Sequence, residues 1–86
     1  MHAVPKGGGF MDQELHSESV QIERKIFCFT LKENPRGRFL RITEDVAGRR
    51  DTVIIPSTGL ARIREILDKI IEADKDAGPP KVEPLN

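Results

Sequence analysis

Two apolar runs joined by a short turn constrain this chain more than any other feature. The turn lies within Lys32–Phe39, which reads K-E-N-P-R-G-R-F. Proline fixes its own φ angle and glycine permits positive φ, so Asn-Pro-Arg-Gly is typical of a chain reversal. The sequence therefore predicts a β-hairpin with arms at Phe27–Lys32 and Arg38–Thr43.

The two predicted strands differ in how apolar and polar side chains alternate along them. In the first arm, both faces carry apolar or small side chains: Phe27, Phe29 and Leu31 on one, Ile26, Cys28 and Thr30 on the other. Such a strand is expected at the centre of a sheet. In the second arm, Leu40 and Ile42 are predicted to face the core, whereas Phe39 and Arg41 are predicted to face outwards.

Polar and basic side chains cluster at the turn, beside the outward-facing Phe39: Asn34, Arg36 and Arg38. An aromatic ring among basic and amide groups on a sheet is typical of a surface that stacks nucleobases and neutralises phosphates. The chain has no net charge, but residues 23–50 hold eight Lys or Arg and four Asp or Glu. Two alternatives remain open: a partner chain covers Phe39, or the arginines form only a solvated basic face.

The rest of the chain predicts further strands at Leu15–Glu23 and Asp51–Ile55, with a turn at Asp45–Arg50 between the third and fourth strands. Pro56 ends the last strand, and Ser57 or Thr58 is expected to cap a helix. The helix is predicted from one apolar stripe: Leu60, Ile63, Ile66, Leu67, Ile70 and Ile71. We expect tails at residues 1–13 and 75–86 to be disordered, around a folded unit at 14–74.

The expected architecture is α+β, with a four-stranded antiparallel sheet followed by one helix that covers the sheet's apolar face. The chain has 86 residues, enough for one small domain with a marginal core. One helix leaves Ile26, Cys28 and part of Val53–Ile55 uncovered. A second copy of the chain would supply the missing cover, so we predict a homodimer.

Several classes of function find no support in the residues. Cys28 is the only cysteine, which indicates a reducing compartment and a small buried side chain rather than a reactive thiol. His16 has no ligand partner at metal-binding spacing and is interpreted as a solvated loop residue, so neither a metal nor another cofactor is expected. No apolar run is long enough to span a membrane, and no constellation of catalytic residues indicates an enzyme.

The segment E-R-K-I-F-C-F-T-L-K-E-N-P-R-G-R-F-L-R-I-T-E-D resembles one repeat of the PUR family, the purine-rich element binding (Pur-alpha-like) proteins. The resemblance covers residues 13–72 and is carried most specifically by K-E-N-x-R-G-R-F-L-R-I. It implies a ββββα repeat, two copies of which intertwine into one PUR domain. A single-repeat chain would complete that domain as a homodimer.

The resemblance also implies binding of purine-rich, GGN-type single-stranded DNA and RNA, with destabilisation of duplexes. By position, Lys32 and Asn34 match contacts to backbone and base, and Phe39 matches the stacking aromatic. The other residues assigned to this surface are basic: Lys25, Arg36, Arg38, Arg41, and Arg49 or Arg50, between which the register is open. Glu23 departs from the family, which often has Gln there, and a carboxylate repels phosphate.

Two functions are therefore weighed. The first is a single-stranded nucleic-acid binding regulator, cytoplasmic and nucleoid-associated in a bacterium or nuclear in a eukaryote. The second is a protein-interaction or dimerisation module with little nucleic-acid binding. The set Lys32, Asn34 and Phe39 favours the first, because a pure dimerisation repeat has no need of it.

Overall fold

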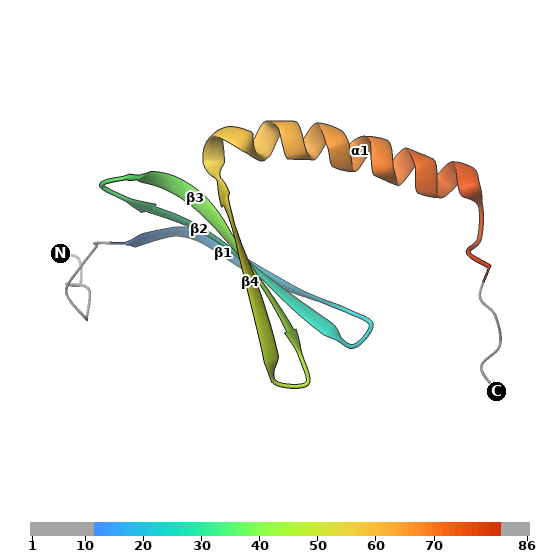
Figure 1. Cartoon of the computed structure of the whole chain (residues 1–86), viewed down its shortest axis with the longest axis horizontal. Helices are drawn as coiled ribbons and strands as arrows, with labels where there is room; N and C mark the ends of the chain where they lie inside the picture. The colour runs from blue at the N-terminus through green and yellow to red at the C-terminus, as the bar shows by residue number, and fades with distance from the viewer. Residues whose placement is uncertain (1–11, 82–86) are drawn as a thin grey trace.

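The computed structural model describes residues 12–81 and has the predicted ββββα order (Figure 1). The strands are β1 (Gln13–Ile22), β2 (Lys25–Asn34), β3 (Gly37–Val46) and β4 (Arg49–Pro56). They form one antiparallel sheet in the order β1-β2-β3-β4, so β2 is central as predicted. A 3-10 turn, η1 (Ser57–Gly59), leads into helix α1 (Leu60–Ala77).

The boundaries differ slightly from those expected from the sequence. Strand β1 begins at Gln13, inside the segment predicted as a tail, and α1 continues to Ala77 instead of ending at residue 74. The helix ends where Gly78 adopts a φ of 75° and its N–H donates to the Lys75 carbonyl. Residues 1–11 and 82–86, which make up most of the predicted tails, lie outside the described residues.

The hairpin turns follow local backbone chemistry. Between β2 and β3, the Arg36 N–H donates to Asn34 Oδ1 at 2.9 Å, an Asx turn. Gly37 follows with a φ of 143°, which is open to glycine and strained for other residues. Between β3 and β4, Ala47 and Gly48 have φ values of 51° and 85°, as the two central positions of a type I′ hairpin require.

The strand register separates the sheet into two faces. Residues that pair across antiparallel strands leave the sheet on the same side. One side, the apolar face, carries most of the hydrophobic side chains of the sheet: Val20, Phe27, Phe29, Leu31, Leu40, Ile42, Val53 and Ile55. Ile26 and Ile54 lie on the other side. The opposite side, the polar face, carries Phe39 and Arg41 among hydroxyl groups, which confirms the predicted alternation of β3.

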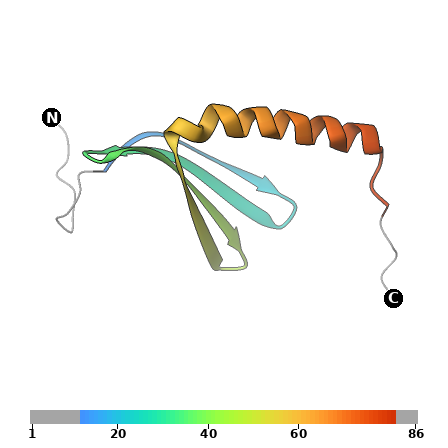
Figure 2. The same cartoon turned by 45° about the horizontal axis from the view of Figure 1, so that its top comes forward.

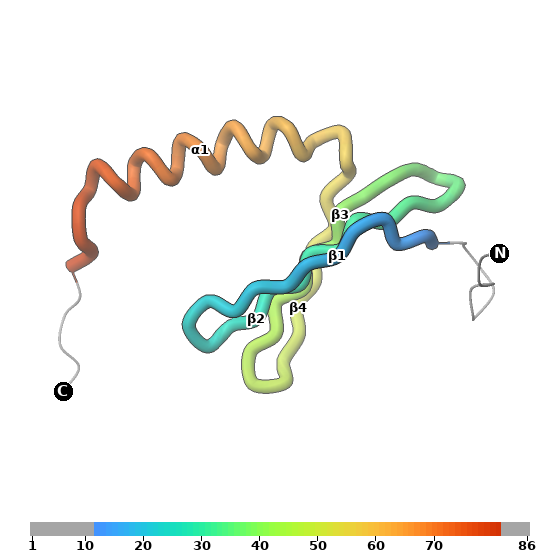
Figure 3. The backbone as a smooth tube through the Cα atoms, turned by 180° about the vertical axis from the view of Figure 1, so that it is seen from behind, coloured from blue at the N-terminus to red at the C-terminus, as the bar shows by residue number. Residues whose placement is uncertain are grey.

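Helix α1 does not cover the apolar face of its own sheet, and that expectation was wrong. The helix contacts chiefly η1, and η1 in turn contacts β3. Figure 2 shows α1 running past the sheet rather than over it, and Figure 3 shows the same separation from behind. The predicted Ser57 or Thr58 cap is also absent, because Gly59 is the N-cap and no side chain caps the helix.

No residue between 12 and 81 is buried within the single chain. The expected core residues Phe27, Cys28 and Phe29 are only half-buried. The apolar stripe of α1 is open, with Ile70 and Ile71 exposed by 56% and 57%. The radius of gyration is 17.3 Å, against about 12 Å for a compact domain of this length. Residues 12–81 of the single chain therefore have secondary structure but no buried core.

Candidate nucleic-acid interface

A row of four facing residues crosses the polar face near the β2–β3 turn. Lys32 pairs with Glu14 on one side and with Phe39 on the other, and Phe39 pairs with Pro56. Phe39 and Lys32 are half-buried. Neighbouring strands lie about 4.8 Å apart, so Phe39 has Lys32 and Pro56 as its direct cross-strand neighbours on this face. This arrangement offers an apolar platform with a cation at its edge.

Arg41 extends the cluster by one position along β3. It pairs with Thr30 and Ile54 on the polar face, and its side chain is exposed. Because alternate residues of a strand share a face, Arg41 follows Phe39 on the same surface. A strand of nucleic acid stacked on Phe39 would therefore meet positive charge on two sides of the ring, at Lys32 and at Arg41.

Asn34 lies at the turn end of the same face. Its Oδ1 accepts the Arg36 N–H at 2.9 Å, and its Nδ2 donates to Asp12 Oδ1 at 2.9 Å. These two bonds fix the orientation of the amide. Arg36 lies on the exposed turn itself, adjacent to the amide.

The four residues Lys32, Asn34, Phe39 and Arg41 on the polar face are called the Phe39 cluster. Arg38 and Lys25 lie on the opposite, apolar face. Arg38 forms an ion pair with Glu33 at 2.6 Å, and Lys25 forms one with Glu44 at 2.9 Å. The hydrogen bond that Lys25 donates to Glu44, with the attraction of the carboxylate's charge, raises the pKa of Lys25 above its usual 10.5. Both cations are thus partnered by carboxylates on the face that carries Phe27 and Ile42.

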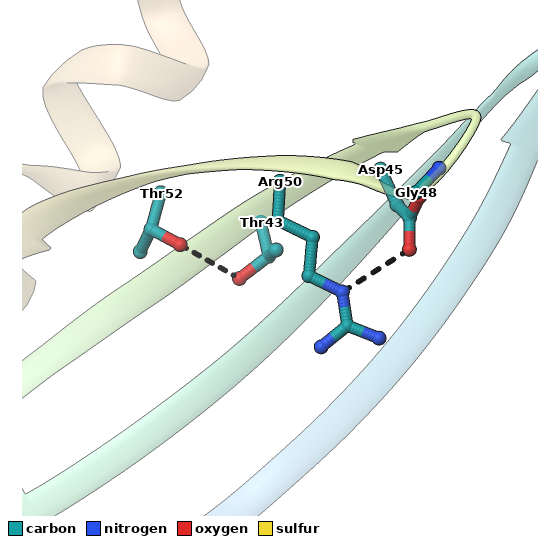
Figure 4. A network of polar contacts seen from close by, with 5 residues as sticks. All are labelled: Thr43, Asp45, Gly48, Arg50 and Thr52. Carbon is teal, nitrogen blue, oxygen red and sulfur yellow. Dashed lines mark hydrogen bonds and ion pairs between the residues drawn. The ribbon is translucent and has the colours of Figure 1, made fainter.

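The structure separates the two candidate arginines at the β3–β4 turn. Arg49 pairs with Val46 on the apolar face, whereas Arg50 pairs with Asp45 on the polar face. Figure 4 shows the Arg50 guanidinium against Asp45, with Nε donating to Oδ2 at 3.2 Å. Asp45 also accepts the Gly48 N–H at 3.3 Å. The same carboxylate therefore stabilises the turn and forms the ion pair with Arg50.

Seven of the nine residues assigned from the sequence fall into two groups at opposite ends of the sheet, while Arg36 and Arg38 lie at or beside the β2–β3 turn, outside both groups. Lys32, Asn34, Phe39 and Arg41 gather on the polar face near the β2–β3 turn. The other group lies at the far end, which holds both the β1–β2 and the β3–β4 turns (Figure 3): Lys25, Arg49 and Arg50. Lys25 and Lys32 are separated along β2 by about 23 Å at about 3.3 Å per residue.

Sequence reasoning missed three neighbours of the Phe39 cluster. Pro56 was interpreted only as the end of a strand, and Asp12 and Glu14 as part of or next to a tail. The spacing of two residues between Asp12 and Glu14 indicates that they share one face of a strand. Their place beside Lys32 and Asn34, however, depends on how this segment pairs with β2. His16, predicted in a loop, lies in β1 instead, exposed and bonded to Glu18.

Two other kinds of site receive no support from the part of the chain that is described. Within residues 12–81, no group of three or more His, Cys, Asp or Glu side chains is placed to hold a metal ion. Across the same range, α1 is not apolar enough to cross a membrane. Cys28 pairs with Ser19 and Thr43 on the polar face and is a free thiol.

The fold agrees with comparisons to known proteins. A family model described as "PurA ssDNA and RNA-binding protein" matches residues 2–80. This chain belongs to the PUR family. The match spans nearly all of the sequence, which confirms the resemblance noted in the K-E-N-P-R-G-R-F segment.

Proteins from a plant and from human are similar in sequence to this chain. Transcription factor Pur-alpha 1 of Arabidopsis thaliana is 42% identical over 64 residues, covering 74% of this chain and 22% of that protein. The human transcriptional regulator protein Pur-beta is 34% identical over 82 residues, covering 93% and 26%. The human transcriptional activator protein Pur-alpha is 37% identical over 77 residues, covering 88% and 24%. The chain thus spans about a quarter of the length of these relatives.

Proposed function

We propose that this chain binds single-stranded DNA and RNA, with a preference for purine-rich strands, and acts as a transcriptional or RNA regulator. The observation that carries the proposal is the position of Phe39 between Lys32 and Pro56, with Arg41 following on the same face. Base–aromatic stacking contributes about 1–3 kcal/mol per base, and nearby cations add a salt-dependent term. The family description and the names of the relatives support the same activity.

Duplex destabilisation follows from the same geometry. An aromatic ring that holds an unstacked base favours the single-stranded form, and the free energy of stacking offsets part of the cost of unpairing. Among the candidate residues, we assign the primary contacts to Lys32, Asn34, Phe39 and Arg41. The residues at the far end of the sheet form a secondary basic site. Such a protein works where nucleic acid is, in a nucleoid or a nucleus.

We further propose that the working unit is a homodimer in which α1 of one copy covers the apolar face of the other. The sheet leaves Val53 exposed by 53%, and the stripe of α1 is equally open. Exposed apolar areas of this kind mark interaction surfaces. A second copy offers both complementary surfaces at once, because each chain has one uncovered sheet and one uncovered helix.

The alternative function, a dimerisation module with little nucleic-acid binding, is favoured by the same exposed surfaces. It gives no role to Phe39 and Arg41, which lie on the opposite face from Phe27 and Ile42. Dimerisation through the apolar face leaves the Phe39 cluster available. The two functions are therefore compatible in one molecule, and a measurement of nucleic-acid binding distinguishes between them.

The test is fluorescence anisotropy with a labelled GGN-repeat single strand, a pyrimidine strand and a duplex, each at two salt concentrations. We expect the purine strand to bind most tightly and its affinity to fall with salt. Phe39→Ala should weaken binding by about 1–3 kcal/mol while sedimentation still reports a dimer. A folded dimer that binds none of the three would contradict the proposed function and favour the alternative.

A further inference from the structure

The acidic start of β1 lies in register with the Phe39 cluster. Asp12 Oδ1 accepts a hydrogen bond from Asn34 Nδ2 at 2.9 Å, and Glu14 pairs directly with Lys32. Two carboxylates therefore face the amide and the ammonium group that the proposed function assigns to nucleic acid. The Asn34 Oδ1 atom accepts the Arg36 N–H, so the oxygen and the nitrogen of this amide each have a partner within the chain.

We propose that Asp12 is an intramolecular competitor that holds one of the two N–H donors of Asn34 Nδ2 and so hinders the binding of a nucleic-acid strand by this amide. A carboxylate oxygen is an anionic acceptor, as is a phosphate oxygen, and both seek the same N–H donor. The negative charge of Asp12 also repels the phosphates of an approaching strand. The contact therefore lowers affinity in two ways, through an occupied donor and through like charge.

The structure of β1 allows Asp12 to release Asn34 without unfolding of the sheet. The register between β1 and β2 shifts between Glu14 and His16, so Gln13 and Glu14 pair with β2 beyond an irregularity, and Asp12 precedes the strand. β1 is also an edge strand, and Asp12 is exposed. Short strand ends of this kind open at low free-energy cost. The segment ahead of the bulge can thus detach while Ser17–Ile22 stays paired.

This inference rests on the proposed function, and its test separates the two. The probe is a labelled GGN-repeat single strand, with affinity measured at low salt for Asp12→Ala. We expect binding to become about two- to tenfold tighter, the range for one hydrogen bond. Asp12→Asn, which keeps an acceptor and loses the charge, should give a smaller increase. The matched control is Asp76→Ala, which removes the same charge from an exposed position at the end of α1 and should leave affinity unchanged.

A double-mutant cycle with Asn34→Ala decides the mechanism. In the Asn34→Ala background, Asp12→Ala should give a clearly smaller gain in affinity, because the donor that Asp12 occupies is gone and only the charge effect remains. An equal gain in both backgrounds would overturn the inference and indicate only general charge. Unchanged or weaker binding by Asp12→Ala in the native background would overturn it as well, the weaker case making Asp12 a positioning residue. If Phe39→Ala still weakens binding in those cases, the proposed function stands without this inference.

Discussion

Lys32 and Phe39 face each other directly in the β2–β3 ladder, so their side chains leave the sheet on the same side. This pairing places a cation at the edge of an aromatic ring, on the face opposite Leu40 and Ile42. The turn between the two strands fixes the pairing, because the Asx turn at Asn34 and the positive φ of Gly37 set the register. The candidate interface is thus a consequence of hairpin geometry.

The ammonium group of Lys32 is expected to contribute chiefly through phosphate. Lys32→Ala should weaken single-strand binding at low salt and reduce the slope of log affinity against log salt by about 0.7. Anisotropy titrations across a series of salt concentrations measure the slope. Lys69→Ala, which removes the same charge from the polar side of α1, is the control. An unchanged slope for Lys32→Ala would mean that Lys32 contacts no phosphate.

Dimerisation through the helix stripe predicts that folding depends on concentration. Because the described residues of one chain have no buried core, dissociation should be coupled to unfolding. Ile70→Asp should lower the thermal midpoint strongly and abolish the dimer, whereas Lys69→Asp on the polar side should have little effect. Scanning calorimetry at two concentrations tenfold apart, with sedimentation, measures both. A midpoint independent of concentration in a folded monomer would refute the homodimer.

Much of the fold follows from particular sequence patterns. The alternation from Phe27 to Leu31 and from Phe39 to Ile42 is sufficient to predict two faces, because a strand repeats every two residues. The apolar stripe from Leu60 to Ile71 likewise predicts the helix. A stripe specifies that a helix has an apolar surface, but not which chain covers it. The expected packing of α1 on its own sheet therefore failed where the helix itself was predicted correctly.

The candidate site was predictable to a similar degree. Phe39 and Arg41 could be placed on the polar face from alternation alone. Arg38 is close to them in sequence, yet its parity puts it on the other face, beside Glu33. The contact of Asp12 with Asn34 could not be predicted, because it depends on the β1–β2 register and on an irregularity near Leu15. Such a contact depends on how strands that are distant in the sequence pair with each other.

The β3–β4 turn contains an alanine in a conformation that disfavours a side chain. Ala47 has a φ of 51°, and L-residues in this left-handed region cost about 1–2 kcal/mol, least for Asn and Gly. Ala47→Asn should therefore raise the free energy of unfolding by about 0.5–1 kcal/mol, since it creates the preferred Asn-Gly hairpin turn. Chemical denaturation at fixed concentration measures the change.

The same substitution in a helix provides the control for this prediction. Ala73 lies within α1, where Asn is a poorer helix former than Ala by about 0.5 kcal/mol. Ala73→Asn should thus destabilise the protein while Ala47→Asn stabilises it. Destabilisation by both substitutions would mean that the left-handed conformation of Ala47 is not the source of strain.

The ion pair between Lys25 and Glu44 predicts a pH dependence at the alkaline end. Glu44 raises the pKa of the Lys25 ammonium above 10.5, through a hydrogen bond first and charge second. A raised pKa means that the folded state holds the proton more tightly, so this stabilisation is complete below pH 10.5 and is lost as pH rises through the folded-state pKa. The contribution is small because Lys25 is exposed.

Proton titration of the Lys25 side chain by NMR checks this assignment. Glu44→Gln should return the pKa of Lys25 towards 10.5, because it removes both effects of the carboxylate. Glu23→Gln is the matched comparison, since Glu23 acts on Lys25 only through a weaker charge effect, and its shift should be smaller. A larger shift from Glu23→Gln would reverse the assigned causes.

The central claim is that nucleobases stack on residue 39, and the sequence allows a direct measurement. The chain has no tryptophan and no tyrosine, so Phe39→Trp introduces a single strongly fluorescent ring at the proposed platform. Titration with a GGN-repeat single strand should quench this fluorescence to saturation, with the same dissociation constant as anisotropy. Lys69→Trp on α1 should show no quenching. Binding seen by anisotropy with unchanged fluorescence of Phe39→Trp would contradict the claim, because the strand would then bind without stacking there.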